Sequence, residues 1–298
     1  MSPYVGRFAP SPTGPLHFGS LVAAVASYLE ARSHQGKWLV RMEDLDSARE
    51  MPGAADSILK TLDKFGFEWD EPVLYQSQRH EHYASPLDQL ANTGLAYPCA
   101  CSRKEISDSA TQGIDGLIYP GTCRHGAPCG KEAKAWRLKV DDTDIQFDDA
   151  IQGNISQNMA KQIGDFVLKR ADGFYAYQLA VVVDDAAQHI THIVRGADLL
   201  DSTSRQIYLQ KRLGFPTPNY AHVPIAANAQ GKKLSKQTLA HDINEKTPVD
   251  TLFLALKFLG QYPPHQLQQT SLKHLWEWAI FHWDLAKIPQ QRLMISSD

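Results

Sequence analysis

The sequence predicts an α/β protein with a parallel sheet, and three observations support this fold class. A short apolar segment at 4–8 runs into a loop rich in Pro and Gly, a helical pattern follows, and a second apolar segment occupies 37–42. Strand, helix and strand in this order open a parallel α/β sheet. With 298 residues, 43% of them hydrophobic, the chain is long enough to bury a core without disulfides. Its length predicts about two domains or one elaborated domain.

The first helix is predicted from apolar side chains that recur on one face. These are Leu21, Val22, Val25, Tyr28 and Leu29. Two further helices are predicted over 54–65 and 79–92, and a glycine ends each of them, Gly66 and Gly94.

The second half of the chain carries a mixed pattern. The segment 175–183 alternates and then becomes wholly apolar, which predicts a central strand with 190–194 as its partner. A helix is predicted over 202–213 and a strand over 222–225. After Lys236 the pattern predicts only helices, at 249–259 and 272–283.

The middle of the chain differs from both halves. From residue 98 to about 130, periodicity is lost and cysteines, glycines and prolines cluster, which indicates an insertion that something other than a core holds together. We therefore expect four parts. They are a first half of the core at 1–96, an insertion at 97–168, a second half of the core at 169–238 and a helical subdomain at 239–298.

Charge and hydropathy exclude some classes of protein. Lys and Arg number 30 and Asp and Glu 33, for a net charge of −3, so overall charge does not indicate a nucleic-acid binder, and any RNA contact must come from a local patch. No apolar run approaches the roughly 20 residues that cross a bilayer. The N-terminus has no basic stretch followed by an apolar run. We expect a cytoplasmic protein with no membrane partner.

The loop after the first strand is the first candidate functional element. His17 and Gly19 lie where this loop opens a helix, and a helix N-terminus offers free N–H groups to a phosphate. Gly19 lets a nucleotide approach the backbone, and His17 is placed to donate to a phosphate oxygen as charge develops there. The alternative is that His17 only caps the helix.

A basic loop at 231–237 is the second candidate. It carries Lys232, Lys233 and Lys236 after Gly231, which suits the neutralisation of a triphosphate and of a leaving pyrophosphate. The alternative is an ordinary solvated basic loop.

Four cysteines in the insertion are the third candidate. Cys99, Cys101, Cys123 and Cys129 lie in a segment without a core of its own, which indicates one tetrahedral zinc ion. From the residues alone, Cys129 is the natural fourth ligand, because four thiolates make a closed structural site. The alternative is a loop of reduced cysteines without metal.

The histidine–glycine loop and the lysine loop together resemble the two signatures of class I aminoacyl-tRNA synthetases, which form aminoacyl-adenylates on a Rossmann-type parallel sheet. Further segments resemble glutamyl-tRNA synthetases, and the resemblance covers residues 3 to about 240. The segments are 7–17 (RFAPSPTGPLH), 41–46 (RMEDLD), 75–77 (YQS), 177–185 and 195–198 (RGAD). Phe18-Gly19-Ser20, the ending KLSKQ at 233–237 and the short chain are most similar to a truncated, glutamyl-queuosine branch of that family. Its members activate glutamate with ATP, without tRNA, and transfer it to queuosine in the anticodon of tRNA-Asp.

The resemblance implies a set of glutamate-binding residues. They are Arg7, Phe8, Ala9, Pro10, Ser11, Glu43, Tyr177 and Arg195. The chemistry agrees, since Arg7 and Arg195 can pair with carboxylates and Glu43 can take the ammonium. Taken without the resemblance, Arg7 and Glu43 could be a structural ion pair and Tyr177 a core residue.

The resemblance also implies the other ligands. It assigns His17, Gly19 and Lys236 to ATP, with His17, Lys233 and Lys236 assisting catalysis and Mg²⁺ accompanying the nucleotide. It makes Cys99, Cys101, Tyr119 and Cys123 the zinc ligands, and we follow it over Cys129. The expected partners are ATP, L-glutamate and the anticodon arm of tRNA-Asp, and we expect a monomer.

Three rival functions compete with this expectation. The nearest is a glutamyl-tRNA synthetase that charges the 3′ end of tRNA-Glu, but only 60 residues follow residue 238, too few for an anticodon-binding domain. The others are a non-catalytic paralogue that binds glutamate or RNA and a nucleotidyltransferase acting on a small metabolite. The two nucleotide loops argue against the non-catalytic paralogue, and the glutamate-binding residues argue against the nucleotidyltransferase.

Overall fold

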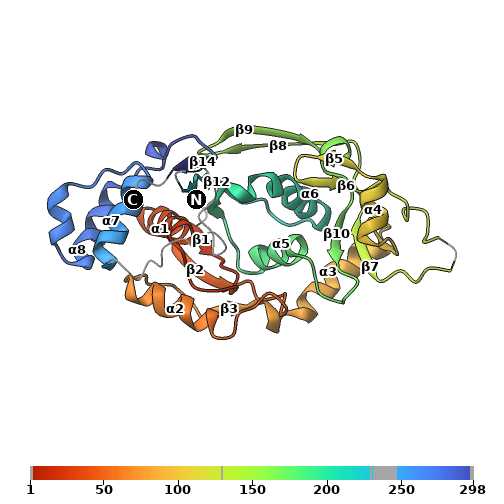
Figure 1. Cartoon of the computed structure of the whole chain (residues 1–298), viewed down its shortest axis with the longest axis horizontal. Helices are drawn as coiled ribbons and strands as arrows, with labels where there is room; N and C mark the ends of the chain where they lie inside the picture. The colour runs from red at the N-terminus through yellow and green to blue at the C-terminus, as the bar shows by residue number, and fades with distance from the viewer. Residues whose placement is uncertain (1–2, 129, 229, 231–246, 296–298) are drawn as a thin grey trace.

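The computed structural model describes residues 3–128, 130–228, 230 and 247–295. The central sheet lies between two flanking parts, the C-terminal helices at one end and the insertion at the other (Figure 1). No helix in these ranges is both long and apolar enough to cross a membrane.

The central sheet is parallel and is built in two ladders. One ladder joins β1 (Val5–Phe8), β2 (Lys37–Met42) and β3 (Leu74–Tyr75). The other pairs β11 (His192–Gly196) with β12 (Asn219–Val223). The backbone N–H of Thr191 donates to the carbonyl of Val5 at 2.9 Å, so the spatial order is β3-β2-β1-β11-β12. The strand order reverses beside β1, which is the Rossmann-type arrangement that the sequence predicted.

The predicted helices pack around this sheet, and most are confirmed to within one or two residues at each end. They are α2 (Ala54–Lys64), α3 (His80–Asn92) and α6 (Thr203–Leu213). α1 (Phe18–Ser33) connects the sheet to the C-terminal part, because it contacts β1, β11 and the C-terminal helices. Short 3-10 turns lie at η1 (Gln76–Gln78) and η3 (Ala197–Ser202).

One predicted strand is wrong. The segment 175–183, expected as a central strand, forms instead the helix α5 (Tyr177–Ala187). Every residue from Leu179 to Asp185 is buried, so the helix has no polar face to reveal its period, and a fully apolar run fits a buried helix or a buried strand equally well. The expected partner strand exists as β11, but it pairs with β12 and not with this segment.

The insertion combines an antiparallel sheet with a hairpin and a short helix. The sheet is formed by β4 (Ala96–Cys99), β7 (Ala135–Leu138) and β10 (Phe166–Lys169), the hairpin by β5 (Thr111–Gly113) and β6 (Gly116–Ile118), and the helix is α4 (Arg103–Ser109). A small separate core is centred on Tyr97, Cys99, Tyr119 and Cys123.

Between β7 and β10 the chain forms a long hairpin that extends the second ladder of the central sheet. It joins β8 (Asp144–Asp149) to β9 (Gly153–Asn158), and a π turn at η2 (Met159–Ile163) comes after it. β8 meets β12 where Asp149 pairs with Tyr220. The domain boundaries expected from the sequence remain a prediction.

The C-terminal part is helical, as predicted, with one exception. α7 (Pro248–Phe258) and α8 (Leu272–His282) pack on α1, and 3-10 turns lie at η5 (His265–Gln269) and η6 (Leu285–Lys287). A short strand β14 (Leu293–Ile295), which the sequence did not predict, pairs with β13 (Ile225–Ala227). The predicted strand 222–225 is interrupted at Pro224, so that β12 and β13 are separate.

Candidate active site

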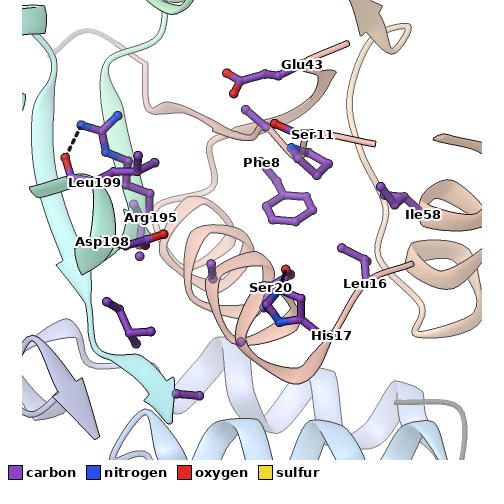
Figure 2. Close-up of a pocket in the computed structure, with 18 of the residues that line it drawn as sticks. Phe8, Ser11, Leu16, His17, Ser20, Glu43, Ile58, Arg195, Asp198 and Leu199 are labelled. Atoms are coloured by element: carbon purple, nitrogen blue, oxygen red, sulfur yellow. Dashed lines mark hydrogen bonds between the residues drawn. The ribbon is translucent and has the colours of Figure 1, made fainter. Parts of the chain in front are cut away.

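One cavity of about 480 Å³ lies at the carboxyl ends of β1 and β11, where the strand order reverses. Ligands bind at this point in open α/β sheets. Glu43 and Ser11 lie toward one end of the cavity and His17 and Ser20 toward the other (Figure 2). The cavity gathers every described residue expected to bind glutamate or ATP, namely Arg7, Phe8, Ala9, Pro10, Ser11, His17, Gly19, Glu43, Tyr177 and Arg195. Lys233 and Lys236 lie outside the described residues.

His17 is the N-cap of α1. Its Nδ1 accepts from the backbone N–H of Ser20 at 3.2 Å, and its Nε2 lies 3.0 Å from the Ser20 hydroxyl. The capping role considered from the sequence is therefore present, and the same side chain lines the cavity. The first turn of α1 holds no acidic side chain, so its N–H groups present positive potential to the cavity.

Arg7 is held by a buried carboxylate from another part of the chain. Its Nε donates to Oδ1 of Asp185 on α5 at 3.1 Å, and Arg41 on β2 donates to the same oxygen at 2.8 Å. Burial alone would raise the pKa of Asp185, but the guanidinium groups of Arg7 and Arg41 outweigh it and lower that pKa. Asp185 thus fixes the guanidinium of Arg7, which lines the cavity, together with that of Arg41, which does not.

Glu43 and Tyr177 are two further polar residues that line the cavity. Glu43 is an ion-pair partner of Arg41 at 3.5 Å, whereas the alternative considered from the sequence paired it with Arg7, which instead pairs with Asp185. Burial raises the pKa of Glu43, and the nearby Arg41 and Arg7 oppose the shift. Burial and the Glu43 carboxylate raise the pKa of Tyr177, so its hydroxyl stays a neutral donor or acceptor.

Arg195 is held on two of its three nitrogens. Its Nε donates to Nε2 of His222 at 2.9 Å, and its Nη2 donates to the Thr203 hydroxyl at 2.9 Å and to the Leu199 carbonyl at 3.4 Å (Figure 2 draws the last of these). Nη1 is buried, and among the described residues no group hydrogen-bonds to it. A buried N–H without a partner is costly, so Nη1 is a donor prepared for a ligand of the cavity.

A second and larger cavity of about 910 Å³ adjoins the first. The two share Ser11, Glu43 and Tyr177. Its far wall comes from the insertion, through Cys101 and Arg137. The insertion therefore forms one side of the approach to the first cavity.

The cysteine cluster of the insertion has four donors. The Sγ atoms of Cys99, Cys101 and Cys123 lie within 4.8 Å of one another, and Oη of Tyr119 lies 3.4 Å from Sγ of Cys99 and 3.3 Å from that of Cys101. A tetrahedral zinc ion with bonds of about 2.3 Å to sulfur and about 2.0 Å to oxygen requires edges of roughly 3.5–3.8 Å between its ligands. The donor set fits such an ion, and Cys129 lies outside the described residues.

Several supporting residues were not anticipated from the sequence. Arg41 and Asp185 lie in the segments 41–46 and 177–185 that resemble the family, but the sequence alone offered no reason to assign a role to either residue. Asp149 and His222 were not singled out at all, although a histidine beside a run of buried strand residues is a signal that could have been weighed. Their partners are distant in sequence, 178 positions for Arg7 and Asp185 and 73 for His222 and Asp149.

The chain is similar to known proteins in its sequence. Residues 4–256 match the family described as tRNA synthetases class I (E and Q), catalytic domain. A glutamyl-Q tRNA(Asp) synthetase from Dechloromonas aromatica is 60% identical over 99% of this chain and 98% of its own length. A protein of the same name from Chromobacterium violaceum is 56% identical over 98% of this chain and 97% of its own length.

The fold has solved counterparts as well. The crystal structure of a glutamate-tRNA synthetase from Elizabethkingia anophelis is similar with a TM-score of 0.82 and 25% identity, covering 99% of this chain and 68% of that one. By sequence and by fold, the chain therefore belongs to the class I tRNA synthetases for E and Q, on the branch of the glutamyl-Q tRNA(Asp) synthetases.

Proposed function

We propose that the chain activates L-glutamate with ATP, without tRNA, and transfers the glutamyl group to queuosine in the anticodon of tRNA-Asp. In the first step an oxygen of the glutamate α-carboxylate attacks the α-phosphorus of ATP in line, and the bond to the leaving pyrophosphate breaks. In the second step a hydroxyl of the queuosine cyclopentene ring attacks the carbonyl carbon, AMP leaves, and an ester bond forms.

The observation that carries this proposal is the buried, unpartnered Nη1 of Arg195 beside Arg7 and Glu43 in one cavity. Glutamate brings two carboxylates and one ammonium, and the cavity offers two guanidinium groups, of Arg7 and Arg195, and two carboxylates, of Glu43 and Asp198. The cavity therefore holds a cationic partner for each carboxylate of glutamate and an anionic partner for its ammonium. Tyr177 adds a neutral hydrogen-bonding group on the same wall.

The nucleotide end of the cavity supports the ATP half of the proposal. The N-terminus of α1, His17 and Gly19 line it, and they suit a phosphate as described above. We assign Lys233 and Lys236 to the pyrophosphate on sequence grounds, and Mg²⁺ accompanies the nucleotide, where it neutralises phosphate charge.

The larger cavity supports the transfer half. It runs from Glu43 and Tyr177 to the insertion, so a nucleoside held there would meet the activated carboxyl group. A zinc ion would belong to this half only as a structural element, since Cys99, Cys101, Tyr119 and Cys123, which would hold it, all come from the insertion.

The test locates the product on the RNA. The protein is incubated with ATP, labelled glutamate and intact queuosine-containing tRNA-Asp. A parallel sample contains the same tRNA after removal of its 3′-terminal adenosine. We expect equal label on both samples and, after nuclease digestion, label in the anticodon fragment only. Queuosine-free tRNA-Asp is the matched control and should take none. Label on tRNA-Glu, or label lost with the 3′ adenosine, would instead indicate a conventional synthetase.

A further inference from the structure

Arg195 depends on a buried histidine and aspartate that have no place in the chemistry described so far. His222 on β12 is the register partner of Arg195 on β11, and Asp149 ends β8 on the other side of β12. None of the three is more than 5% exposed, so no solvent competes for their hydrogen bonds. They form a row that crosses three strands of the sheet and ends at the glutamate cavity.

The direction of each hydrogen bond in this row is fixed by arginine. A guanidinium is always protonated and can only donate, so Nε of Arg195 donates to Nε2 of His222 at 2.9 Å. Nε2 must then carry a lone pair. Because burial lowers the pKa of His222 to about 4, the ring is neutral near pH 7 and its single proton lies on Nδ1.

Asp149 holds that proton in place. Its Oδ2 lies 2.5 Å from Nδ1 of His222, close enough for a strong hydrogen bond to the carboxylate. Its other oxygen, Oδ1, accepts backbone N–H groups of Ile151, Gln152 and His222 at 3.1, 2.8 and 3.1 Å. Main-chain N–H groups therefore anchor one oxygen of the carboxylate, and within the part of the chain that the structure describes the other oxygen hydrogen-bonds to the histidine alone.

We propose that Asp149 and His222 are positioning residues for glutamate binding. Together they fix the histidine tautomer that accepts from Arg195, so that the guanidinium turns its one unpartnered nitrogen, Nη1, to a carboxylate of glutamate. This inference rests on the proposed function, because it assumes that glutamate is the ligand of the cavity.

The structure allows the tautomer itself to be inverted. In Asp149→Asn the amide oxygen keeps the three backbone N–H groups, which leaves the NH₂ group to face Nδ1 of His222. Nδ1 must then accept, the ring proton moves to Nε2, and an N–H faces the N–H of Arg195. Nε of Arg195 loses its acceptor without any loss of side-chain volume, and among the described residues the guanidinium is then oriented by the bonds of Nη2 to Thr203 and Leu199 alone.

Two substitutions of His222 separate the contacts. In His222→Gln the amide oxygen stands near the former Nε2 and still accepts from Arg195, whereas His222→Asn reaches Asp149 but not Arg195. The double variant Asp149→Asn/His222→Gln has no tautomer to invert. We therefore expect it to bind glutamate better than Asp149→Asn alone, which independent structural damage would not produce.

The experiment measures L-glutamate binding by calorimetry and the KM values in glutamate-dependent ATP–pyrophosphate exchange. We expect the Kd and KM for glutamate to rise on the order of tenfold or more in Asp149→Asn and His222→Asn, and less than about threefold in His222→Gln, with the KM for ATP unchanged. Asp165→Asn is the matched control, because Asp165 is equally buried but lies in the insertion, on Arg124. It should leave glutamate binding unchanged.

Long-range ¹H–¹⁵N spectra provide a readout that does not depend on activity. The wild-type protein should show His222 protonated on Nδ1, and Asp149→Asn should show it protonated on Nε2. Unchanged glutamate binding in folded Asp149→Asn, or an Nε2–H tautomer in the wild type, would overturn the positioning role. Wild-type protein that binds no glutamate at all would overturn the proposed function itself.

Discussion

Replacing Tyr119 by Phe removes one oxygen from the four-donor cluster of the insertion and changes little else in the side chain. The Tyr119 hydroxyl oxygen lies 3.3–3.4 Å from two cysteine sulfurs and also accepts the backbone N–H of Cys123 at 3.0 Å. Two separate losses are therefore expected. One appears only when zinc is bound, and the other appears with or without the metal.

The two losses differ in size. Structural zinc sites bind with about 10–16 kcal/mol over four ligands, so one ligand corresponds to roughly 2.5–4 kcal/mol, or a weakening of zinc binding on the order of 100- to 1,000-fold. The buried amide of Cys123, left without its acceptor, costs about 1–3 kcal/mol of folding free energy in the absence of metal.

The assay measures zinc affinity by competition with a chromogenic chelator, and urea unfolding with and without excess chelator. In excess chelator, we expect Tyr119→Phe to lower the unfolding free energy only by the cost of the lost hydrogen bond to Cys123. With zinc bound, we expect the decrease to include the lost zinc ligand as well. Cys129→Ser is the control, since it removes the other candidate ligand considered from the sequence. If Tyr119→Phe keeps wild-type zinc affinity while Cys129→Ser loses it, the assignment of Tyr119 as fourth ligand is refuted.

Three further predictions concern the nucleotide-binding core. His17→Ala should lower the unfolding free energy by about 1 kcal/mol through the lost N-cap and should also reduce pyrophosphate exchange, whereas His17→Asn should restore stability in urea but not exchange. Asp185→Asn should cost about 3–5 kcal/mol in urea unfolding, because Arg7 and Arg41 remain buried without their shared carboxylate, and a loss below about 1 kcal/mol would contradict this. The pKa of His222 is lowered from 6.5 to about 4, so the unfolded chain takes up the proton first as pH falls. The neutral form of His222 therefore stabilises the fold fully above pH 6.5, and this stabilisation of about 3 kcal/mol is lost as the pH falls toward 4. In His222→Gln, the unfolding free energy should depend less steeply on pH between pH 6.5 and pH 4.

Local pattern was sufficient for the opening of the fold. The apolar segments that form β1 and β2, and the one-sided pattern of α1, are decided by neighbours within a few residues, so the sequence predicted them. The loop between β1 and α1 likewise led directly to His17 and Gly19 at the cavity.

The sequence was insufficient to predict the type of a completely buried element, or the role of a residue whose partners are distant in the chain. α5 is surrounded on all sides, so its apolar run looked like a strand. Asp185 and Asp149 gain their roles only from arginine and histidine side chains that the folded sheet brings to them. Tyr119 was expected as a ligand only through family resemblance, because a lone tyrosine between cysteines carries no pattern of its own.

Arg137 joins the cysteine cluster of the insertion to the larger cavity. Its guanidinium lies 4.0 Å from the ring centroid of Tyr119, its Nε donates to Sγ of Cys99 at 3.3 Å, and the same residue lines the cavity that we assign to the RNA nucleoside. The smaller cavity shares no residue with the cluster. Under the function proposed above, the two half-reactions therefore differ in their sensitivity to the cysteine cluster. We expect zinc removal or thiol oxidation to weaken the transfer of glutamate to RNA more than glutamate-dependent ATP–pyrophosphate exchange.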